Sequence, residues 1–393
     1  MSGKLRGAFS LVSVAVIAAA CSSGASPSPT GTPSATASAA TSASASASVS
    51  TSAASSSSLK IGVVTDVGSI TDKNFNQYSY EGAKAAAAAL GATVNYVVPA
   101  DASDYTKDIQ GFVDQNYNVI VTVGFNLGDA TITAAKANPK IWFIAVDVAP
   151  CVTAAGAPDS TFACKGDAAT LLPKLIGIQF QEDQAGYLAG MVAAAVSKTG
   201  VIGMIGGVNN NPAVVRYMQG FQLGAVAYKA STQVKSAFFS TGDVTKAYGD
   251  PTWGKTFGAQ FITQQGVDVL FPVAGATGNA ALDAACSASI TAIGVDVDEY
   301  LSYTSADKCT VTSAEKHLSN AVQQTIAAIA GGSAKGGISK FNAANNGVGY
   351  SPFHNTSITL PSDLQGKLDT ALAAMKAGTL TTCPAQCGTW TGQ

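Results

Sequence analysis

The feature that most constrains the fold is an alternation between short apolar runs and longer alanine-rich runs from Lys60 onward. The short runs favour β-strands, and the longer runs have the length and composition of helices. Alternation of this kind is typical of βαβ units, which build a parallel sheet. The expected strands are Lys60–Thr65, Thr93–Val98, Val119–Val123, Trp142–Val146, Val201–Ile205, Gln233–Ser240, Val267–Val273 and Ala292–Val295.

Most of these runs are apolar on both faces, as expected for strands that helices cover on two sides. The series divides near residues 175–180, and each half then holds about four βα units. The sequence therefore predicts an α/β fold of two doubly wound parallel-sheet lobes joined by crossover hinge segments, which resembles the type I periplasmic binding proteins. We expect lobe 1 to span 59–178 and to be completed by about 298–330. Lobe 2 is expected to span 179–297, completed by part of 331–393, with crossings near 177–179 and 297–300 and a third towards the C-terminus.

The N-terminal residues have the composition of an export signal. Lys4 and Arg6 precede an apolar stretch that ends in Ala18-Ala19-Ala20-Cys21. This pattern predicts a signal peptide over 1–20 and resembles the lipobox that directs lipidation of Cys21. An ordinary signal peptide followed by a chance cysteine is the alternative. Residues 22–58 are rich in Ser, Ala and Thr and predict a disordered tether between an anchor and the folded body.

Beyond Cys21 the chain has six cysteines, and an even number in an exported chain indicates disulfides. Six cysteines allow 15 connectivities. Pairing of neighbours is the simplest: Cys151 with Cys164, Cys286 with Cys309, and Cys383 with Cys387. The spacings lack the paired CxxC pattern of zinc sites, so no metal is expected.

Charge and motif content disfavour two other classes of protein. The formal net charge is −2 and only 12% of residues are charged, which gives no sign of a nucleic-acid-binding surface. No GxSxG elbow, P-loop or GxGxxG after a strand occurs, and the chain has only two histidines. We therefore expect neither an enzyme nor a cofactor.

Polar and aromatic residues follow the expected strands in both halves. In open α/β sheets, ligands bind beyond the carboxyl ends of the strands, so these residues are candidates for a binding cleft. Each aspartate has a second interpretation as a helix N-cap, which is common after a strand. The candidates found in this way are Asp66, Phe125, Asp147, Gly275 and Asp296.

Ordered motifs through most of the chain resemble the basic membrane protein family of purine nucleoside receptor lipoproteins. Residues 65–68 and 72–77 are similar to its opening motif, and Phe180 to Gly190 is similar to its second signature. Further matches follow at 206–207, 219–221, 266–269, 274–278, 294–298 and 311–316.

The resemblance implies a receptor that holds a base between aromatic rings and a ribose with acidic groups. It implies that Asp66, Asp147 and Asp296 contact the ligand, that Phe75 is the stacking ring of lobe 1, and that Gly275 approaches the ligand through its backbone. It further implies ligand-site roles for Asn74, Asn76 and Lys316. The chain departs from the family near 239–255, where Phe239, Tyr248 and Trp253 are candidates for the second ring and Tyr248 or Trp253 is favoured.

The predicted function is that of a lipid-anchored, extracytoplasmic substrate-binding protein of an ABC importer, on the outer face of a bacterial cytoplasmic membrane. The predicted ligand is a nucleoside, most simply a purine nucleoside, and the predicted partner is an ABC permease. A receptor of the same fold for riboflavin, a free sugar or a nucleobase is one alternative. A surface sensor lipoprotein without a transporter is the other.

Overall fold

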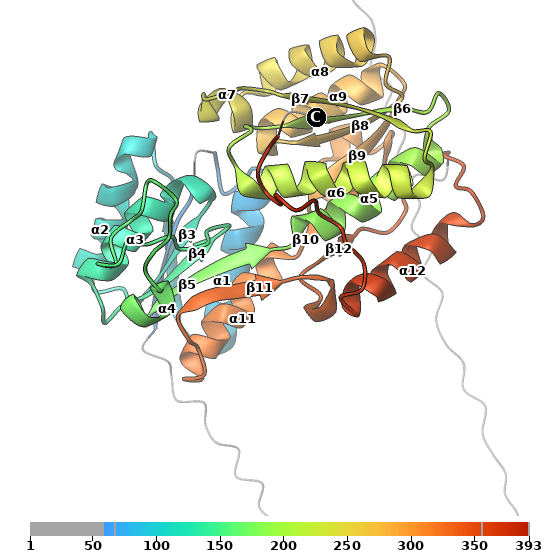
Figure 1. The fold of residues 1–393 in the computed structure, drawn as a ribbon. Coiled ribbons are helices and arrows are strands. Elements are labelled where there is room, and N and C mark those ends of the chain that lie inside the picture. The colour runs from blue at the N-terminus through green and yellow to red at the C-terminus, as the bar shows by residue number, and fades with distance from the viewer. Residues whose placement is uncertain (1–58, 67, 355–356, 392–393) are drawn as a thin grey trace, which may run out of the picture. The chain divides into compact units, whose positions relative to one another are not determined.

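Two six-stranded sheets dominate the folded body (Figure 1). The computed structural model describes residues 59–66, 68–354 and 357–391. The predicted signal peptide, Cys21 and the tether lie outside the described residues. The first sheet has the order β11-β5-β4-β3-β1-β2, and its neighbouring strands pair in parallel. Its strands are β1 (Lys60–Val64), β2 (Thr93–Val97), β3 (Val119–Val123), β4 (Trp142–Val146), β5 (Leu175–Phe180) and β11 (Gly337–Phe341).

The second sheet repeats the same arrangement in the order β12-β10-β9-β8-β6-β7. Its edge strand β12 runs antiparallel to β10, and the other pairings are parallel. The strands are β6 (Val201–Gly206), β7 (Gln233–Phe238), β8 (Val269–Val273), β9 (Thr291–Asp296), β10 (Thr310–Lys316) and β12 (Val348–Tyr350). The predicted α/β fold with two parallel-sheet lobes is confirmed, and both sheets show the doubly wound 2-1-3-4-5 order.

The chain crosses between the sheets at three places. It leaves the first sheet after β5, returns to it after β10, and leaves again between β11 and β12. The structure differs here from the expectation that 298–330 completes lobe 1, because β10 pairs with β9 in the second sheet and only residues beyond Lys316 return. The polar sequence of β10, TVTSAEK, lacks the apolar run that identifies a buried strand.

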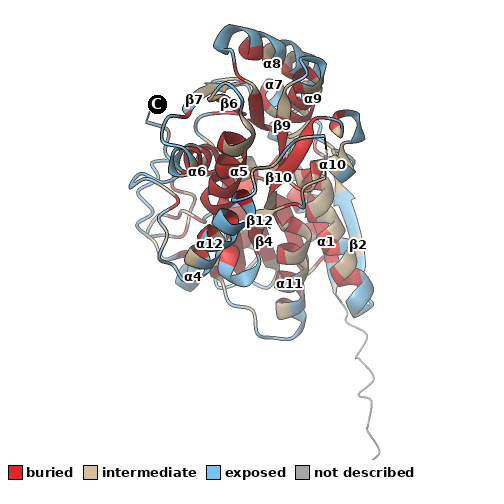
Figure 2. Cartoon of the chain, turned by 90° about the vertical axis from the view of Figure 1, so that its right-hand side faces the viewer, coloured by how far each residue is buried: buried red, intermediate tan, exposed pale blue. Residues whose placement is uncertain are grey.

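Helices cover the sheets, and Figure 2 shows buried residues on the inner strands and on α5 (Glu182–Val196), with exposed residues on the edge strand β2 and on outward turns of α8 (Pro251–Gln265). Asn211 and Asp250 are the N-cap residues of α6 and α8, where their side chains accept hydrogen bonds from backbone N–H groups, and a proline follows each of them. At the other end, α1 and α8 are followed by Gly91 and Gly266, which adopt the left-handed conformation. The helices are α1 (Phe75–Leu90), α2 (Tyr105–Asp114), α3 (Gly128–Ala137), α4 (Ala168–Leu171), α5 (Glu182–Val196), α6 (Pro212–Tyr228), α7 (Val244–Tyr248), α8 (Pro251–Gln265), α9 (Gly275–Ser287), α10 (Glu299–Ser302), α11 (Leu318–Ala330) and α12 (Leu364–Lys376). Short 3₁₀ turns lie at Ala102–Asp104, Phe125–Leu127, Thr304–Ala306 and Ala343–Asn345.

Helices α5 and α6 approach each other through four glycines. A Cβ on Gly190 would lie 2.0 Å from the carbonyl oxygen of Phe221, and one on Gly224 would lie 1.9 Å from that of Tyr187. Gly186 and Gly220 make equally close approaches to the facing backbone. Because backbone atoms cannot yield as a flexible side chain can, this contact requires glycine and fixes the two helices that begin at the ligand-facing edge of the second sheet.

The described residues contain the three disulfides that neighbour pairing predicts, Cys151–Cys164, Cys286–Cys309 and Cys383–Cys387. The last of these closes a loop beyond α12, and Gln219 of α6 holds this segment by donating to the carbonyl oxygens of Gln386 and Thr389. Within the described ranges, none of the helices has both the length and the apolar character to span a bilayer.

We predict that Gly190→Ala lowers the free energy of unfolding by about 1–3 kcal/mol or more, because the added methyl group forces α5 and α6 apart. Gly111→Ala is the matched control, since Gly111 lies inside α2 and a Cβ there would meet nothing within 4 Å. That change should raise stability by about 0.5–1 kcal/mol through helix propensity. Urea unfolding of both variants measures the difference, and equal effects of the two substitutions would contradict the close-packing account.

Candidate ligand-binding site

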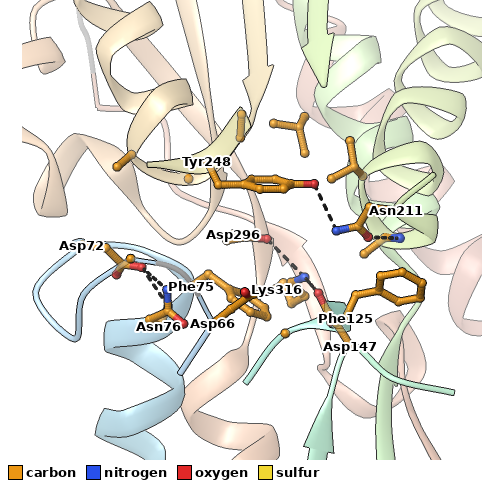
Figure 3. A pocket seen from close by; sticks show the side chains of 18 of the residues that line it. Asp66, Asp72, Phe75, Asn76, Phe125, Asp147, Asn211, Tyr248, Asp296 and Lys316 are labelled. Carbon is orange, nitrogen blue, oxygen red and sulfur yellow. Dashed lines mark hydrogen bonds and ion pairs between the residues drawn. The ribbon is translucent and has the colours of Figure 1, made fainter. Parts of the chain in front are cut away.

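A cavity of about 730 Å³, counted to its open mouth, lies between the carboxyl ends of the two sheets. Each lobe contributes side chains from loops that follow its strands and from helix starts (Figure 3). The predicted residues that line the cavity are Asp66, Phe75, Asn76, Phe125, Asp147, Tyr248, Gly275, Asp296 and Lys316.

Aromatic rings from the two lobes border the cavity. Phe75 begins α1 in the first lobe, and Tyr248 ends α7 in the second. Figure 3 shows these two side chains on opposite sides of the cavity, with Phe125 near Asp147. A flat ligand between the two rings could contact both of its faces.

Tyr248 is held in place by two features of the loop after β6. Asn211 donates a hydrogen bond to its hydroxyl at 3.2 Å. Gly207 leaves room for the ring, because a Cβ there would lie 2.3 Å from a ring carbon of Tyr248. Burial raises the pKa of the Tyr248 hydroxyl, which the hydrogen bond with Asn211 opposes, and the group stays neutral at ordinary pH.

Two aspartates of the first lobe are already engaged in local hydrogen bonds. Asp72 accepts from the backbone N–H groups of Asn74, Asn76 and Gln77 and so organises the start of α1. Burial raises the pKa of Asp72, and these hydrogen bonds oppose the rise. Asp66 accepts from the hydroxyl of Tyr105 and, at 3.0 Å, from the side-chain amide of Asn126.

Asp147 and Asp296 occupy matching places in the two lobes. Asp147 directly follows β4, and Asp296 ends β9, which is the equivalent strand of the second sheet. Both have left-handed backbones, with φ of +61° and +66°. A non-glycine residue in this conformation is strained, and such strain clusters at functional sites.

The ammonium of Lys316 lies between these carboxylates. Its Nζ atom is 2.7 Å from an oxygen of Asp147, 3.5 Å from one of Asp296 and 3.6 Å from one of Glu182. The rings of Phe75, Phe180 and Tyr217 surround it with centroids 4.8, 5.4 and 5.7 Å away. Only 2% of the Lys316 side chain is exposed.

The charges in this cluster control each other's ionisation. Burial raises the pKa of Asp147 to about 6, and the ammonium of Lys316 limits the rise. Burial opposes the charge of Lys316, but Asp147, Asp296 and Glu182 outweigh it and raise the pKa of the lysine. Arg216 of α6 donates to Glu182 at 2.6 Å, so a second cation holds the third carboxylate.

Two predicted residues lie outside the cavity. Asn74 is fully buried and donates to Glu299 of α10 at 2.6 Å, which makes it a polar contact between α1 and the second lobe. Trp253 lies on α8, where its indole N–H donates to the carbonyl oxygen of Phe239 at 2.9 Å. Asn74 is the N-cap residue of α1, and Trp253 lies in the first turn of α8. In these positions both side chains contact other parts of the protein and do not line the cavity.

Three polar side chains that line the cavity were absent from the sequence-based set: Asp72, Asn211 and Tyr217. Asp72 belongs to the opening motif, and Asn211 follows a strand, so the sequence contained a feature by which each could have been predicted as a site residue. Tyr217 had none, because it sits in the middle of an apolar helix and has the pattern of a core residue. Its hydroxyl donates to Asp296 at 3.0 Å.

One group of residues in the described ranges has the geometry to hold a metal ion: Asp183, Cys383 and Cys387. The two sulfur atoms form a disulfide, and Asp183 accepts from the hydroxyl of Thr382. The group does not line the cavity.

Comparison with protein families gives a match over most of the chain. The profile of the PnrA-like ABC transporter substrate-binding proteins (Bmp) matches residues 59–371. The nucleoside-binding protein BmpA of an ABC transporter from Lactococcus lactis subsp. cremoris (strain MG1363) is 30% identical over 256 residues, 62% of this chain and 65% of that protein. Basic membrane protein D of Borreliella burgdorferi (strain JD1) is 27% identical over 258 residues, 65% of this chain and 67% of that protein. The chain thus spans roughly two thirds of these relatives, and less than two thirds of BmpA.

Solved structures support the fold. An ABC transporter solute-binding protein from Aeropyrum pernix K1 superposes with a TM-score of 0.68 at 20% identity, covering 84% of this chain and 94% of that one. A Caulobacter myo-inositol-binding protein gives 0.53 at 14% identity, covering 79% and 96%. At these identities the likeness concerns the arrangement of helices and strands.

We predict that Asp147→Asn flattens the dependence of stability on pH. The folded-state pKa of Asp147 is about 6 against an ordinary 3.8, so its protonated form stabilises the fold below pH 4 and this contribution is lost as pH rises through 6. The loss is on the order of 2–3 kcal/mol between pH 4 and 7 and should be absent from the variant.

Urea unfolding at pH 4, 5, 6 and 7 measures this slope. Asp101→Asn is the control of opposite sign, because hydrogen bonds from Ser103 lower the pKa of that exposed carboxylate. Its contribution to stability appears as pH rises, so removing it should change the slope in the other direction. An unchanged slope in Asp147→Asn would contradict the assignment.

Proposed function

Since this chain belongs to the family of PnrA-like ABC transporter substrate-binding proteins, we propose that it binds a purine nucleoside between its lobes and delivers it to the permease of an ABC importer. The family is one of substrate-binding proteins and not of enzymes. A relative named as nucleoside-binding, BmpA, supports the choice of ligand class.

The observation that carries the proposal is the placement of two rings and two strand-end carboxylates around one cavity. Phe75 and Tyr248 border it on opposite sides, and Asp147 and Asp296 lie between the lobes (Figure 3). A base would stack between the rings while the ribose hydroxyls donate to the carboxylates. This division of roles matches the chemistry of a nucleoside, which joins a flat aromatic group to a set of hydroxyls.

Buried acceptors in the cavity support a ligand that donates hydrogen bonds. Within the described part of the chain, Asp147 Oδ1 and Asn76 Oδ1 are buried and have no hydrogen-bond partner. A buried polar atom without a partner costs about 1–3 kcal/mol, so a ligand hydroxyl or amino group that reaches it gains that energy back. Carboxylate hydrogen bonds contribute about 1.5–3 kcal/mol each, which favours discrimination by the sugar.

We extend the proposal to the location of the protein. The pattern at Cys21 supports lipidation, and the Ser/Ala/Thr-rich residues 22–58 would tether the folded body to the outer face of the cytoplasmic membrane. Metabolic labelling with a fatty acid, compared between the native chain and Cys21→Ala, tests the anchor. Equal labelling of the two would overturn it.

We predict that adenosine, guanosine or inosine binds the folded body from residue 59 onward, and that Phe75→Ala and Tyr248→Ala each weaken binding at least about tenfold through lost stacking and burial. Trp253→Ala is the matched control, since this ring lies outside the cavity, and it should leave affinity within about twofold. Calorimetric titration after denaturation and refolding measures the affinities. A response only to riboflavin, ribose or adenine would replace the nucleoside with that ligand.

We further predict that the site rejects phosphorylated ligands. The lining residues include four aspartates and one lysine: Asp66, Asp72, Asp147, Asp296 and Lys316. A 5′-phosphate adds about −1.5 to −2 charge units, so a nucleoside monophosphate should bind at least about tenfold more weakly than its nucleoside. The same titration provides the comparison. Equal affinities would contradict the prediction and would show that the phosphate of the bound ligand lies outside the acidic cavity, in solvent.

A further inference from the structure

We propose that Asn74 and Glu299 form a latch between the two lobes, which favours their closed arrangement and holds the ring of Phe75 against the ligand. The inference rests on the proposed nucleoside function, and it concerns side chains that lie outside the cavity. It makes Asn74 a positioning residue in place of the ligand contact that the sequence resemblance implied.

The side chain of Asn74 does not serve the helix that it begins. Asn74 is the N-cap residue of α1, yet its side chain makes no capping hydrogen bond with the described residues. An N-cap asparagine ordinarily accepts from a backbone N–H group of the first helical turn. Asp72 does this instead, because its carboxylate accepts from the N–H groups of Asn76 and Gln77 at 3.0 Å each. The amide of Asn74 is therefore left to contact the second lobe.

The second lobe receives this amide at the carboxylate of Glu299. Nδ2 of Asn74 donates to Oε1 of Glu299 at 2.6 Å and to the carbonyl oxygen of Val295 at 3.4 Å. The second lobe holds the carboxylate from its own side: Val295 donates its N–H to Oε2 at 3.0 Å, and the side-chain amide of Asn279 lies 2.6 Å from Oε1. Gly294 leaves room for the group, because a Cβ there would lie 2.7 Å from Oε2.

The contact is shielded from water. Asn74 and Glu299 are 0% and 1% exposed. Burial raises the pKa of Glu299, and the hydrogen bonds from Val295 and Asn74 oppose the rise. A hydrogen bond is stronger in such surroundings than in water. Rotation of the lobes about the crossings would separate Asn74 from Glu299 and hydrate both, so the contact favours closure.

The latch lies directly behind two walls of the cavity. Asn74 precedes Phe75, which lines the cavity from the first lobe, and Val295 precedes Asp296, which lines it from the second. The contact therefore sets the spacing of these walls. A ligand that needs both walls binds the closed arrangement more tightly, and its apparent affinity rises with the fraction of molecules that are closed.

The test reverses donor and acceptor across the latch. In Asn74→Asp a second carboxylate faces Glu299, so calorimetric titration should show the best-binding nucleoside weakened at least about tenfold. In the double variant of Asn74→Asp and Glu299→Gln, the introduced amide can donate to the introduced carboxylate and still accept from Val295. Affinity should then return to within about threefold of the native value. A double variant as weak as Asn74→Asp would overturn the proposal.

Binding kinetics separate a latch from a general structural effect. A ligand can engage one lobe before closure, so Asn74→Asp should raise the dissociation rate at least about tenfold and leave the association rate within about threefold. Stopped-flow fluorescence measures both rates, and a loss that lies in the association rate would overturn the proposal. Asn116→Asp is the matched control, because it adds the same charge at an exposed position after α2 and should change neither rate.

A second variant covers failure of Asn74→Asp to fold. Asn74→Ser keeps a residue type that caps helices well but is too short to reach Glu299. It should also raise the dissociation rate at least about tenfold. Dissociation at the native rate would overturn the latch.

A scattering measurement distinguishes failure of the latch from failure of the proposed function. Should the native protein bind no nucleoside, the proposed function fails, and solution scattering without ligand then tests the latch alone. A larger radius of gyration in Asn74→Asp than in the native protein and the double variant supports the latch. Equal radii in all three proteins overturn it.

Discussion

The buried ammonium of Lys316 is the contact on which the site depends, because it lies where the two sheets meet and attracts carboxylates from both. Taking a charge out of water is costly unless partners compensate it. Here Asp147, Asp296 and Glu182 supply the compensation, and Arg216 balances part of their negative charge. The ionisation of these buried groups therefore depends on how the two lobes that carry them are placed relative to each other.

The rest of the fold supplies rigid positions for this cluster. Parallel strands of the same order bring their carboxyl ends to the cavity in each lobe. Glycines at 186, 190, 220 and 224 allow α5 and α6 to pack backbone to backbone, which fixes Glu182 and Arg216 at the starts of these helices. Strain in the left-handed aspartates is sustained by these surroundings.

The sequence predicted which kinds of side chain form the site better than it predicted which residues these side chains contact. Asp147 and Asp296 were found because a residue after a parallel strand must lie at the carboxyl edge of its sheet. Tyr217 was missed because a tyrosine among apolar helical residues usually indicates core packing. Asn74 was placed in the cavity by its neighbours Phe75 and Asn76, but successive residues at a helix start point in different directions, and its side chain contacts Glu299.

By itself, the sequence determined the α/β class, the two parallel-sheet lobes and the strand-end carboxylates, and it offered the disulfide pairs only as the simplest of 15 connectivities. These features follow from local periodicity, from spacing along the chain and from the direction of parallel strands. Only the tertiary structure decided that β10 belongs to the second sheet, that Tyr248 and not Trp253 borders the cavity, and that Lys316 is enclosed by carboxylates. The physical reason is that each depends on contacts between segments far apart in sequence, which no local pattern encodes.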